Sequence, residues 1–143
     1  MTELYDDLKI SRIMVAVEGS ENSKRAGDYA IKMGLELHAE VVALHVVPSG
    51  NPFPEENLEK GTKYDYAYLD RLGEQSNNAG VKLEIDIVRA ESPIVNEIVQ
   101  YANRKNIDLI IVGIRSVSDF RFMLGSTATG IVEGARCPVL IAK

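Results

Sequence analysis

Short apolar segments alternate along the chain with longer stretches of helical periodicity. Four of these segments are rich in β-branched residues and almost continuously apolar: 12–17, 40–47, 108–113 and 138–142. Continuous apolar strands are typical of a parallel sheet that helices cover on both faces. A fifth segment, 81–88, alternates apolar and charged residues, which predicts a strand at the sheet edge with one solvated face.

Four helices are predicted between these strands. Their starts are expected near Ser20, at residues 62–65, at Ser92-Pro93 and at Gly125-Ser126, because capping residues and proline favour the beginning of a helix. The residues expected on the buried faces of the first three helices are Ala26, Ala30, Met33 and Leu37, then Leu69, Leu72 and Ala79, and then Val95, Ile98, Val99 and Ala102. The last helix is expected to run through Ile131 and Val132 to Gly134. Five strands alternating with four helices predict an α/β fold with a parallel sheet.

The length of the chain, 143 residues, is typical of one domain. The irregular stretch from Pro48 to Pro54 is interpreted as a loop leaving the second strand, because too little sequence lies on either side of it for two cores. We therefore expect residues 1–143 to form a single domain.

Composition excludes several classes of partner. Lys and Arg number 16 and Asp and Glu 21, so a net charge of −5 argues against binding nucleic acid or anionic lipid electrostatically. No apolar run approaches the roughly 20 residues needed to span a bilayer, and residues 1–7 are acidic rather than signal-like. One cysteine, Cys137, and two histidines are too few for an internal disulfide or a cysteine- or histidine-based metal site. We expect a cytoplasmic protein with no membrane partner and no bound structural metal.

Candidate chemistry lies where the strands end, since ligands bind at the carboxyl edge of a parallel sheet. Gly113 ends one strand, and Gly125, Ser126 and Thr127 open a helix. Glycine allows a ligand to approach the backbone, and a helix start exposes N–H groups that suit phosphate. Residues 111–143 also carry four basic and two acidic residues, the sign that a polyphosphate needs. An equally open alternative is that these residues only end a strand and cap a helix, with solvated arginines.

The sequence contains no signature of an enzyme: no phosphate loop with lysine, no dinucleotide fingerprint and no nucleophile elbow. His45, inside an apolar strand, is interpreted as a hydrogen-bonded core or cavity-lining histidine rather than a base. Cys137 is interpreted as a buried, unreactive thiol. We predict no catalytic residues.

Several segments together resemble the universal stress protein family, over essentially the whole chain. They are residues 15–23 (VAVEGSENS), 44–47 (LHVV), 108–113 (DLIIVG), 124–126 (LGS) and 137–141 (CPVLI). The resemblance implies a Rossmann-like three-layer α/β/α fold with a five-stranded parallel sheet and four helices. It also implies a homodimer paired through the last strand, Pro138–Ala142, which is a short and apolar sheet edge.

ATP-binding members of that family carry glycine, two residues, glycine, nine residues, glycine and then serine or threonine. Gly113 and Gly125-Ser126 match the ends of this pattern, but Ser116 replaces the second glycine and eight residues rather than nine follow it. By resemblance Gly113 would face the ribose, and Gly125 and Ser126 would hold phosphates. Glu18 stands where the family has a ribose-binding aspartate.

The sequence thus suggests a regulatory protein that binds ATP, with Mg²⁺, or a related adenine nucleotide. The candidate binding residues are Ala16, Val17, Glu18, Val46, Gly113, Arg115, Ser116, Gly125, Ser126 and Thr127. Binding is expected to order the loop from Ile114 to Leu124 and so change the surface offered to an unidentified protein partner. One alternative is a homodimeric interaction module of the same family that binds no nucleotide. Another is slow ATP hydrolysis, for which the sequence offers no evident base or water-positioning residue.

Overall fold

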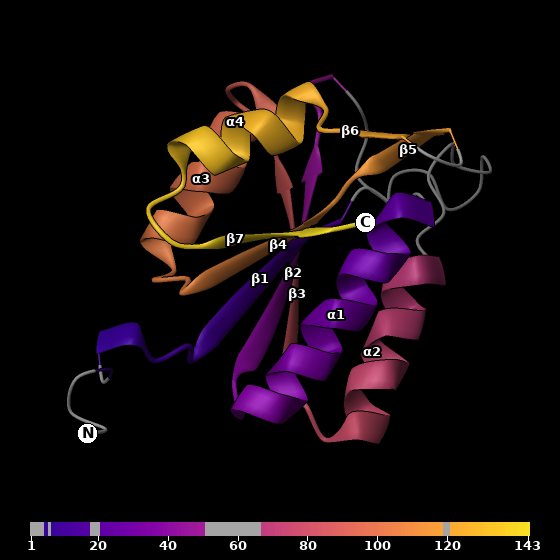
Figure 1. Cartoon of the computed structure of the whole chain (residues 1–143), viewed down its shortest axis with the longest axis vertical. Helices are drawn as coiled ribbons and strands as arrows, with labels where there is room; N and C mark the ends of the chain where they lie inside the picture. Colours follow the sequence, from indigo (N-terminus) through magenta and orange to yellow (C-terminus); the bar gives the residue numbers. More distant parts are fainter. Residues whose placement is uncertain (1–4, 6, 18–20, 51–66, 119–120) are drawn as a thin grey trace.

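Five parallel strands form the central sheet of the computed structural model (Figure 1). The structure describes residues 5, 7–17, 21–50, 67–118 and 121–143, with the backbone alone for 21–23, 115–118 and 121–123. The sheet order is β3-β2-β1-β4-β7. These strands are β1 (Arg12–Ala16), β2 (Glu40–Val47), β3 (Leu83–Arg89), β4 (Leu109–Gly113) and β7 (Val139–Ala142).

Two pairs of helices cover the two faces of the sheet (Figure 1). On one face lie α1 (Glu21–Leu37) and α2 (Ala67–Ala79), and on the other lie α3 (Ile94–Arg104) and α4 (Ser126–Gly134). This arrangement confirms the predicted three-layer α/β/α architecture, with five parallel strands and four helices in the described residues.

Each face of the sheet buries its own apolar core, which explains why the inner strands are continuously apolar. Ile13, Val15 and Ile111 pack toward α1 and α2, whereas Met14 and Ile110 pack toward α3 and α4. All five are fully buried. The alternating segment forms β3 at one edge of the sheet, as predicted, and β7 forms the other edge.

One residue predicted on a buried helix face, Leu37, is exposed instead, and Val132 of the last helix is exposed as well. Leu37 is 41% exposed, because it is the last residue of α1 and the chain turns away at His38, which has φ 54°. Val132 is 46% exposed, since the inward face of α4 is formed by Ala128 and Ile131.

The start of α3 also differs from the prediction. Pro93 is the N-cap residue rather than the first residue of the helix, and no side chain caps it directly. The Ser92 hydroxyl, predicted to cap α3, donates instead to Glu97 Oε1 at 2.8 Å. The caps predicted at Ser20 and at residues 62–65 lie outside the described residues.

The segment expected to be a loop between Ile114 and Leu124 contains a β-hairpin. Strands β5 (Arg115–Ser118) and β6 (Arg121–Met123) pair antiparallel, with Ser116 opposite Phe122 and a register shift between Ser116 and Ser118. Val117 and Phe122 have high strand propensity, which the loop predicted from the glycine pattern did not take into account. The hairpin projects beyond the central sheet, between β4 and α4 (Figure 1).

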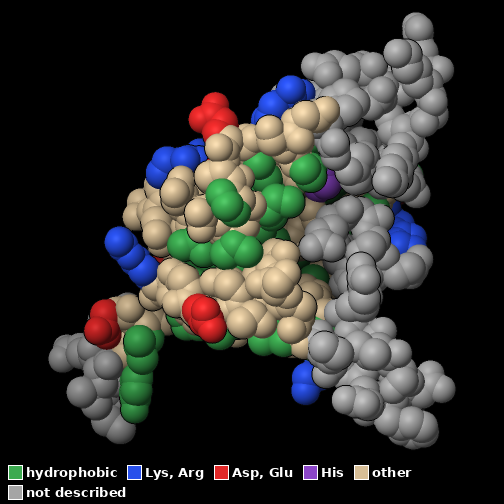
Figure 2. All heavy atoms as spheres, turned by 90° about the horizontal axis from the view of Figure 1, so that it is seen from above, with side chains coloured by type: hydrophobic (Ala, Val, Ile, Leu, Met, Phe, Trp, Pro, Cys, Tyr) green, Lys and Arg blue, Asp and Glu red, His purple; other side chains and the backbone are tan. Residues whose placement is uncertain are grey.

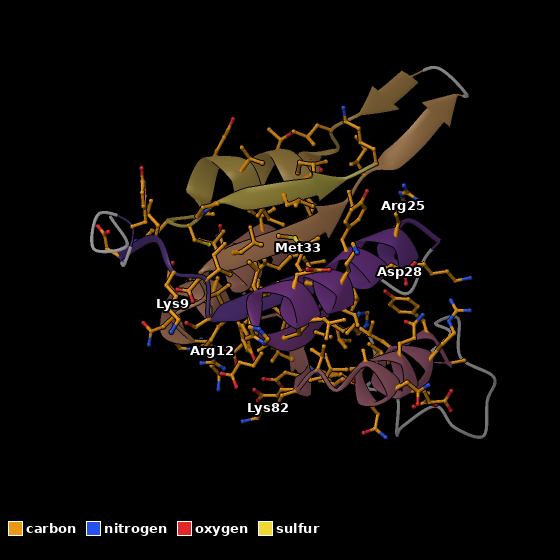
Figure 3. All side chains as sticks on the ribbon, turned by 60° about the horizontal axis from the view of Figure 1, so that its bottom comes forward. Lys9, Arg12, Arg25, Asp28, Met33 and Lys82 are labelled. Carbon is orange, nitrogen blue, oxygen red and sulfur yellow. The ribbon has the colours of Figure 1, made fainter. Side chains whose placement is uncertain are left out.

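Charged side chains join the strands at the opposite, amino-terminal end of the sheet. Arg12 Nε lies 2.9 Å from Glu40 Oε1, and Lys82 Nζ lies 3.4 Å from Glu40 Oε2. Figure 3 shows Arg12 and Lys82 at this end. The Asp108 carboxylate accepts the amides of Ser11 and Arg12 at 2.8 and 2.9 Å, which ties the start of β1 to β4.

Candidate functional site

A cavity of about 300 Å³ opens at the carboxyl ends of β1, β2 and β4. The order of the strands reverses between β1 and β4, so this is the switch point where parallel sheets bind ligands. The start of α3 and the start of α4 close the cavity on their face of the sheet. The cavity volume is at the lower end of the range for small-molecule sites.

Five of the predicted site residues line this cavity. They are Ala16, Val17, Val46, Gly113 and Thr127, from four different elements or their ends. Fold topology therefore brings together residues that are more than a hundred positions apart in the sequence.

The other predicted residues lie elsewhere or are not described. Gly125 and Ser126 are exposed at the start of α4, just before the lining residue Thr127. Arg115 and Ser116 belong to β5, and the structure describes only their backbone. Glu18 lies outside the described residues.

Most of the apolar wall was not predicted. The additional apolar lining residues are Leu44, Pro48, Ile94, Ile98, Val112, Ala128 and Ile131. The helical periodicity of residues 94–102 placed Ile98 on an inward face, but periodicity alone does not reveal that the core leaves space at the strand ends.

The first turn of α4 lies at the rim of the cavity. Gly125 is its N-cap residue, and the Thr129 amide donates to the Gly125 carbonyl at 2.9 Å, which begins the helical bonding. The N–H groups of Ser126, Thr127 and Ala128 precede the first possible donor of that ladder and therefore have no partner within the helix. An added Cβ at Gly125 would meet nothing within 4 Å, so the approach to this turn is open.

His45 holds the end of β1 beside the cavity. The side chain is 5% exposed, and its Nδ1 lies 2.8 Å from the Val17 carbonyl oxygen. A carbonyl only accepts, so Nδ1 carries the hydrogen. The Val17 amide donates to the Leu44 carbonyl at 2.9 Å, so both backbone groups of Val17 are tied to β2. This confirms the interpretation of His45 as a hydrogen-bonded histidine that lines a cavity.

Glu97 fixes the turn that leads into α3. Its Oε1 accepts the amides of Glu91 and Ser92, both at 2.9 Å, in addition to the Ser92 hydroxyl. The hydrogen bond from the Ser92 hydroxyl, followed by that from the Glu91 amide, lowers the pKa of Glu97. The carboxylate thus holds the chain immediately before Ile94, the first residue of α3 and part of the cavity wall.

The helices α3 and α4, which both contribute residues to the cavity wall, approach each other closely at Gly130. An added Cβ at Gly130 would stand 2.7 Å from Val95 Cγ1 and 3.0 Å from Val95 Cγ2. One turn further along, Gly134 faces Val99. Gly130 therefore allows α4 to lie against α3 more closely than any larger residue would.

The described cavity wall has few polar side chains, namely those of His45 and Thr127. Cys137 lies away from the cavity on the approach to β7 and is only partly buried, whereas a buried thiol was predicted; this partial burial raises the pKa of the thiol. The described part of the chain holds no cluster of three or more His, Cys, Asp or Glu residues that could bind a metal ion. Within the same ranges, no helix has both the length and the apolar character that crossing a membrane requires.

Comparison with known families decides the relationship of the chain. The model of the universal stress protein family matches residues 9–143. The chain belongs to this family. A universal stress protein of Methanocaldococcus jannaschii is 32% identical over 141 residues, which cover 92% of this chain and 81% of that protein.

Solved structures of other universal stress proteins share the fold. One is the protein from Archaeoglobus fulgidus in complex with dAMP, with a TM-score of 0.72, 22% identity, and coverage of 94% of this chain and 99% of that one. Another is a family protein from Arabidopsis thaliana with AMP bound, with a TM-score of 0.69, 23% identity, and coverage of 93% and 91%. At this identity the likeness establishes a common fold.

Proposed function

We propose that this universal stress protein is a regulatory protein that binds an adenine nucleotide in the cavity beside β1, β2 and β4. The observation that carries the proposal is an apolar cavity at the strand switch point, with an open helix N-terminus at its rim. A flat base gains by burial between apolar walls, and a phosphate gains from the free amides of a helix start. Structures of two other family members contain dAMP and AMP, which supports the choice of adenine.

The base belongs in the apolar part of the cavity, between the sheet and the wall of α3. The last residue of β1 paired with β2 is Ala16, opposite Leu44, whereas β2 continues to Val47. The backbone N–H and C=O of Val46 that face β1 therefore lie beyond the last paired residue of that strand. A donor and an acceptor side by side can read the edge of a base.

The ribose and the phosphates belong at the rim. We place the ribose near Gly113 and Glu18 and the first phosphate at Gly125, Ser126 and Thr127. For ATP, further phosphates would need donors such as Arg115 and Ser116, and Mg²⁺ would be held mainly by the phosphates themselves. The N–H groups and hydroxyls at the start of α4 fit a phosphate in chemical type, and the apolar wall fits a base.

A partner protein would recognise the nucleotide-bound state through the position of the hairpin formed by β5 and β6. Its two ends are attached to the cavity, because β4 ends at the lining residue Gly113 and α4 begins one residue before Thr127. A ligand that contacts both attachments favours one position of the hairpin over others.

A second part of the proposal is a homodimer through β7. This strand is an edge of the sheet, its sequence Val-Leu-Ile-Ala carries no charge, and its first three residues are only half-buried. Figure 2 views the molecule from the side of α3 and α4 and shows hydrophobic side chains gathered on this face. Antiparallel pairing with a second copy would cover the edge. Sedimentation of Leu140→Lys should give monomers where the parent chain gives dimers.

Titration calorimetry with AMP and ATP, on protein first denatured and refolded to remove any retained nucleotide, tests the binding site. Gly125→Val should weaken binding at least tenfold, because the side chain would stand where the phosphate approaches, at a position where an added Cβ meets nothing within 4 Å in the free protein. Gly73→Val is the matched control, since a Cβ there also meets nothing within 4 Å but the position is remote from the cavity. Absence of any binding at millimolar AMP and ATP would leave the interaction module as the better account.

A further inference from the structure

The free edge of β3 is the strongest feature that nucleotide binding leaves unused. The Val41 amide of β2 donates to the Lys82 carbonyl, and the Ala90 amide donates to the Val47 carbonyl of β2. Lys82 and Ala90, which flank β3 on its two ends, are both even-numbered. Backbone groups of a strand point alternately to its two sides, so the even-numbered residues of β3 bond to β2. The N–H and C=O groups of Leu83, Ile85 and Ile87 therefore point outward. Among the described strands, none pairs with this side of β3.

A groove lies directly above this edge. It has a volume of about 820 Å³ and is lined by one face of α2, by the turn after that helix and by the first half of β3. Ile85 is 41% exposed at its margin, and an added Cβ at Gly73 in the groove would meet nothing within 4 Å. Leu69 and Leu83 contribute further apolar surface. The groove has room for alternate side chains of an additional strand.

The charges around the groove are mainly acidic. Asp70 and Glu74 line it from α2, and Glu84 and Asp86 lie on the opposite face of β3, where the Asp86 carboxylate accepts a hydrogen bond from the Tyr101 hydroxyl at 2.8 Å. The one cation among the lining residues, Lys82, lies 3.4 Å from Glu40. Glu84 has Arg12 at 3.8 Å, but that guanidinium lies closer to Glu40, at 2.9 Å. A strand that pairs here would therefore be favoured by basic side chains.

We propose that β3 and the α2 groove bind an extended segment of another protein in which basic and apolar residues alternate. The segment adds to the sheet as a sixth strand, with backbone hydrogen bonds to the outward groups of Leu83, Ile85 and Ile87. Its apolar residues enter the groove beside Gly73, and its basic residues meet the acidic groups around the edge. This mode of recognition takes affinity from the main chain and specificity from alternate side chains.

A second copy of this chain is a poorer occupant of the β3 edge. Antiparallel pairing of β3 with itself about its centre places Asp86 opposite Asp86, and like charges in that position are destabilising. The uncharged strand β7 would pair here only in a head-to-tail manner, which produces rings or open chains of subunits rather than a closed dimer.

The test uses three labelled peptides and the full chain. The first peptide alternates four lysines with three valines, the second replaces each lysine by glutamate, and the third places the four lysines before the three valines. Fluorescence anisotropy should show binding of the alternating basic peptide, at least tenfold weaker binding of the blocked peptide and none of the acidic one. Hydrogen exchange should slow at the amides of Leu83, Ile85 and Ile87 when the alternating basic peptide is added.

Two variants of α2 distinguish binding of the peptide in the groove from non-specific electrostatic attraction between the basic peptide and the acidic protein. Gly73→Leu extends a side chain into the groove from a position where an added Cβ meets nothing within 4 Å, and it should raise the Kd of the alternating basic peptide at least tenfold. Asn78→Leu, at an exposed position of the same helix outside the groove, should change it less than twofold. Ile85→Lys provides a second block at the edge, should Gly73→Leu fail to fold.

Several outcomes would overturn the proposal. They are equal binding of the two lysine peptides, unchanged exchange at the three outward amides, or equal effects of Gly73→Leu and Asn78→Leu. Slow exchange of those amides without peptide, together with subunit association that Ile85→Lys abolishes, would show that a second copy occupies the edge. Because none of these measurements involves a nucleotide, failure here leaves the proposed function untouched.

Discussion

Replacing Gly130 by alanine tests whether the contact between α3 and α4 sets the shape of the cavity wall. The new Cβ would stand 2.7 Å from Val95 Cγ1, 3.0 Å from Cγ2 and 3.4 Å from Cβ. A valine side chain on a helix has one strongly preferred rotamer, so it cannot swing away from all three contacts. The two helices must therefore separate by several tenths of an ångström.

Two effects of opposite sign determine the stability of this variant. Overpacking of a well-packed contact costs about 1–3 kcal/mol. Replacing a glycine inside a helix by alanine gains about 1 kcal/mol. We therefore expect Gly130→Ala to lower the free energy of unfolding by about 1 kcal/mol, with a range from about zero to 2.

Denaturant unfolding followed by circular dichroism, in a double-mutant cycle, isolates the contact. In a Val95→Ala background the clashing methyl groups are absent, so Gly130→Ala should become stabilising. Gly73→Ala is the control in the parent chain, because a Cβ there meets nothing within 4 Å and only the gain in helix propensity remains. Under the proposed function, Gly130→Ala should also weaken AMP binding, and Val95→Ala should restore part of the loss. An equal effect of Gly130→Ala in both backgrounds would refute the packing argument.

Three further predictions concern single side chains. Burial, aided by Asp28, raises the pKa of Tyr68 from 10.0 to about 12. The stability that its neutral phenol contributes is therefore complete below pH 10 and is lost as pH rises toward 12. The unfolding free energy of Tyr68→Phe, measured against pH, should fall less over this range than that of the parent. The pKa of Glu97 is lowered from 4.5, so the stability contributed by its carboxylate is present above that pH and is lost as pH falls below it. Glu97→Gln should therefore be less stable than the parent at neutral pH, and this difference in stability should shrink in acid. His45→Phe should destabilise the chain by about 1–3 kcal/mol in denaturant unfolding, because it leaves the buried Val17 carbonyl without its donor. An unchanged denaturation midpoint for His45→Phe would contradict the role assigned to that hydrogen bond.

The sheet and its helices were predictable because burial imposes simple patterns. Strands covered on both faces need apolar residues at every position, as in β4, while β3 alternates because it forms an edge. His45 was predictable on similar grounds, since a polar side chain inside an apolar strand needs a hydrogen-bond partner.

The cavity wall and the caps were less accessible to sequence reasoning. That Ile94 and Ile98 face a space rather than other side chains depends on where α3 begins relative to the strand ends, which no local pattern encodes. The serine-proline signal favoured Ser92 as a cap, whereas the Glu97 carboxylate holds the turn from five residues further along. The hairpin of β5 and β6 was not predicted, because the segment between Gly113 and Gly125 was interpreted from its glycine spacing as a loop and not from the strand propensity of its residues.

The central claim is that an adenine nucleotide binds in the cavity, and the isoleucine methyl groups of this chain test it most directly. Methyl-labelled protein should be titrated with AMP and followed by NMR. Ring currents of a bound purine should shift the δ1 methyl signals of Ile94, Ile98 and Ile131, which line the cavity, in a saturable manner. The signals of Ile13 and Ile111, buried on the opposite face of the sheet, should stay in place. Cavity methyl signals that do not move at millimolar AMP, or saturable shifts confined to the opposite face, would contradict the account.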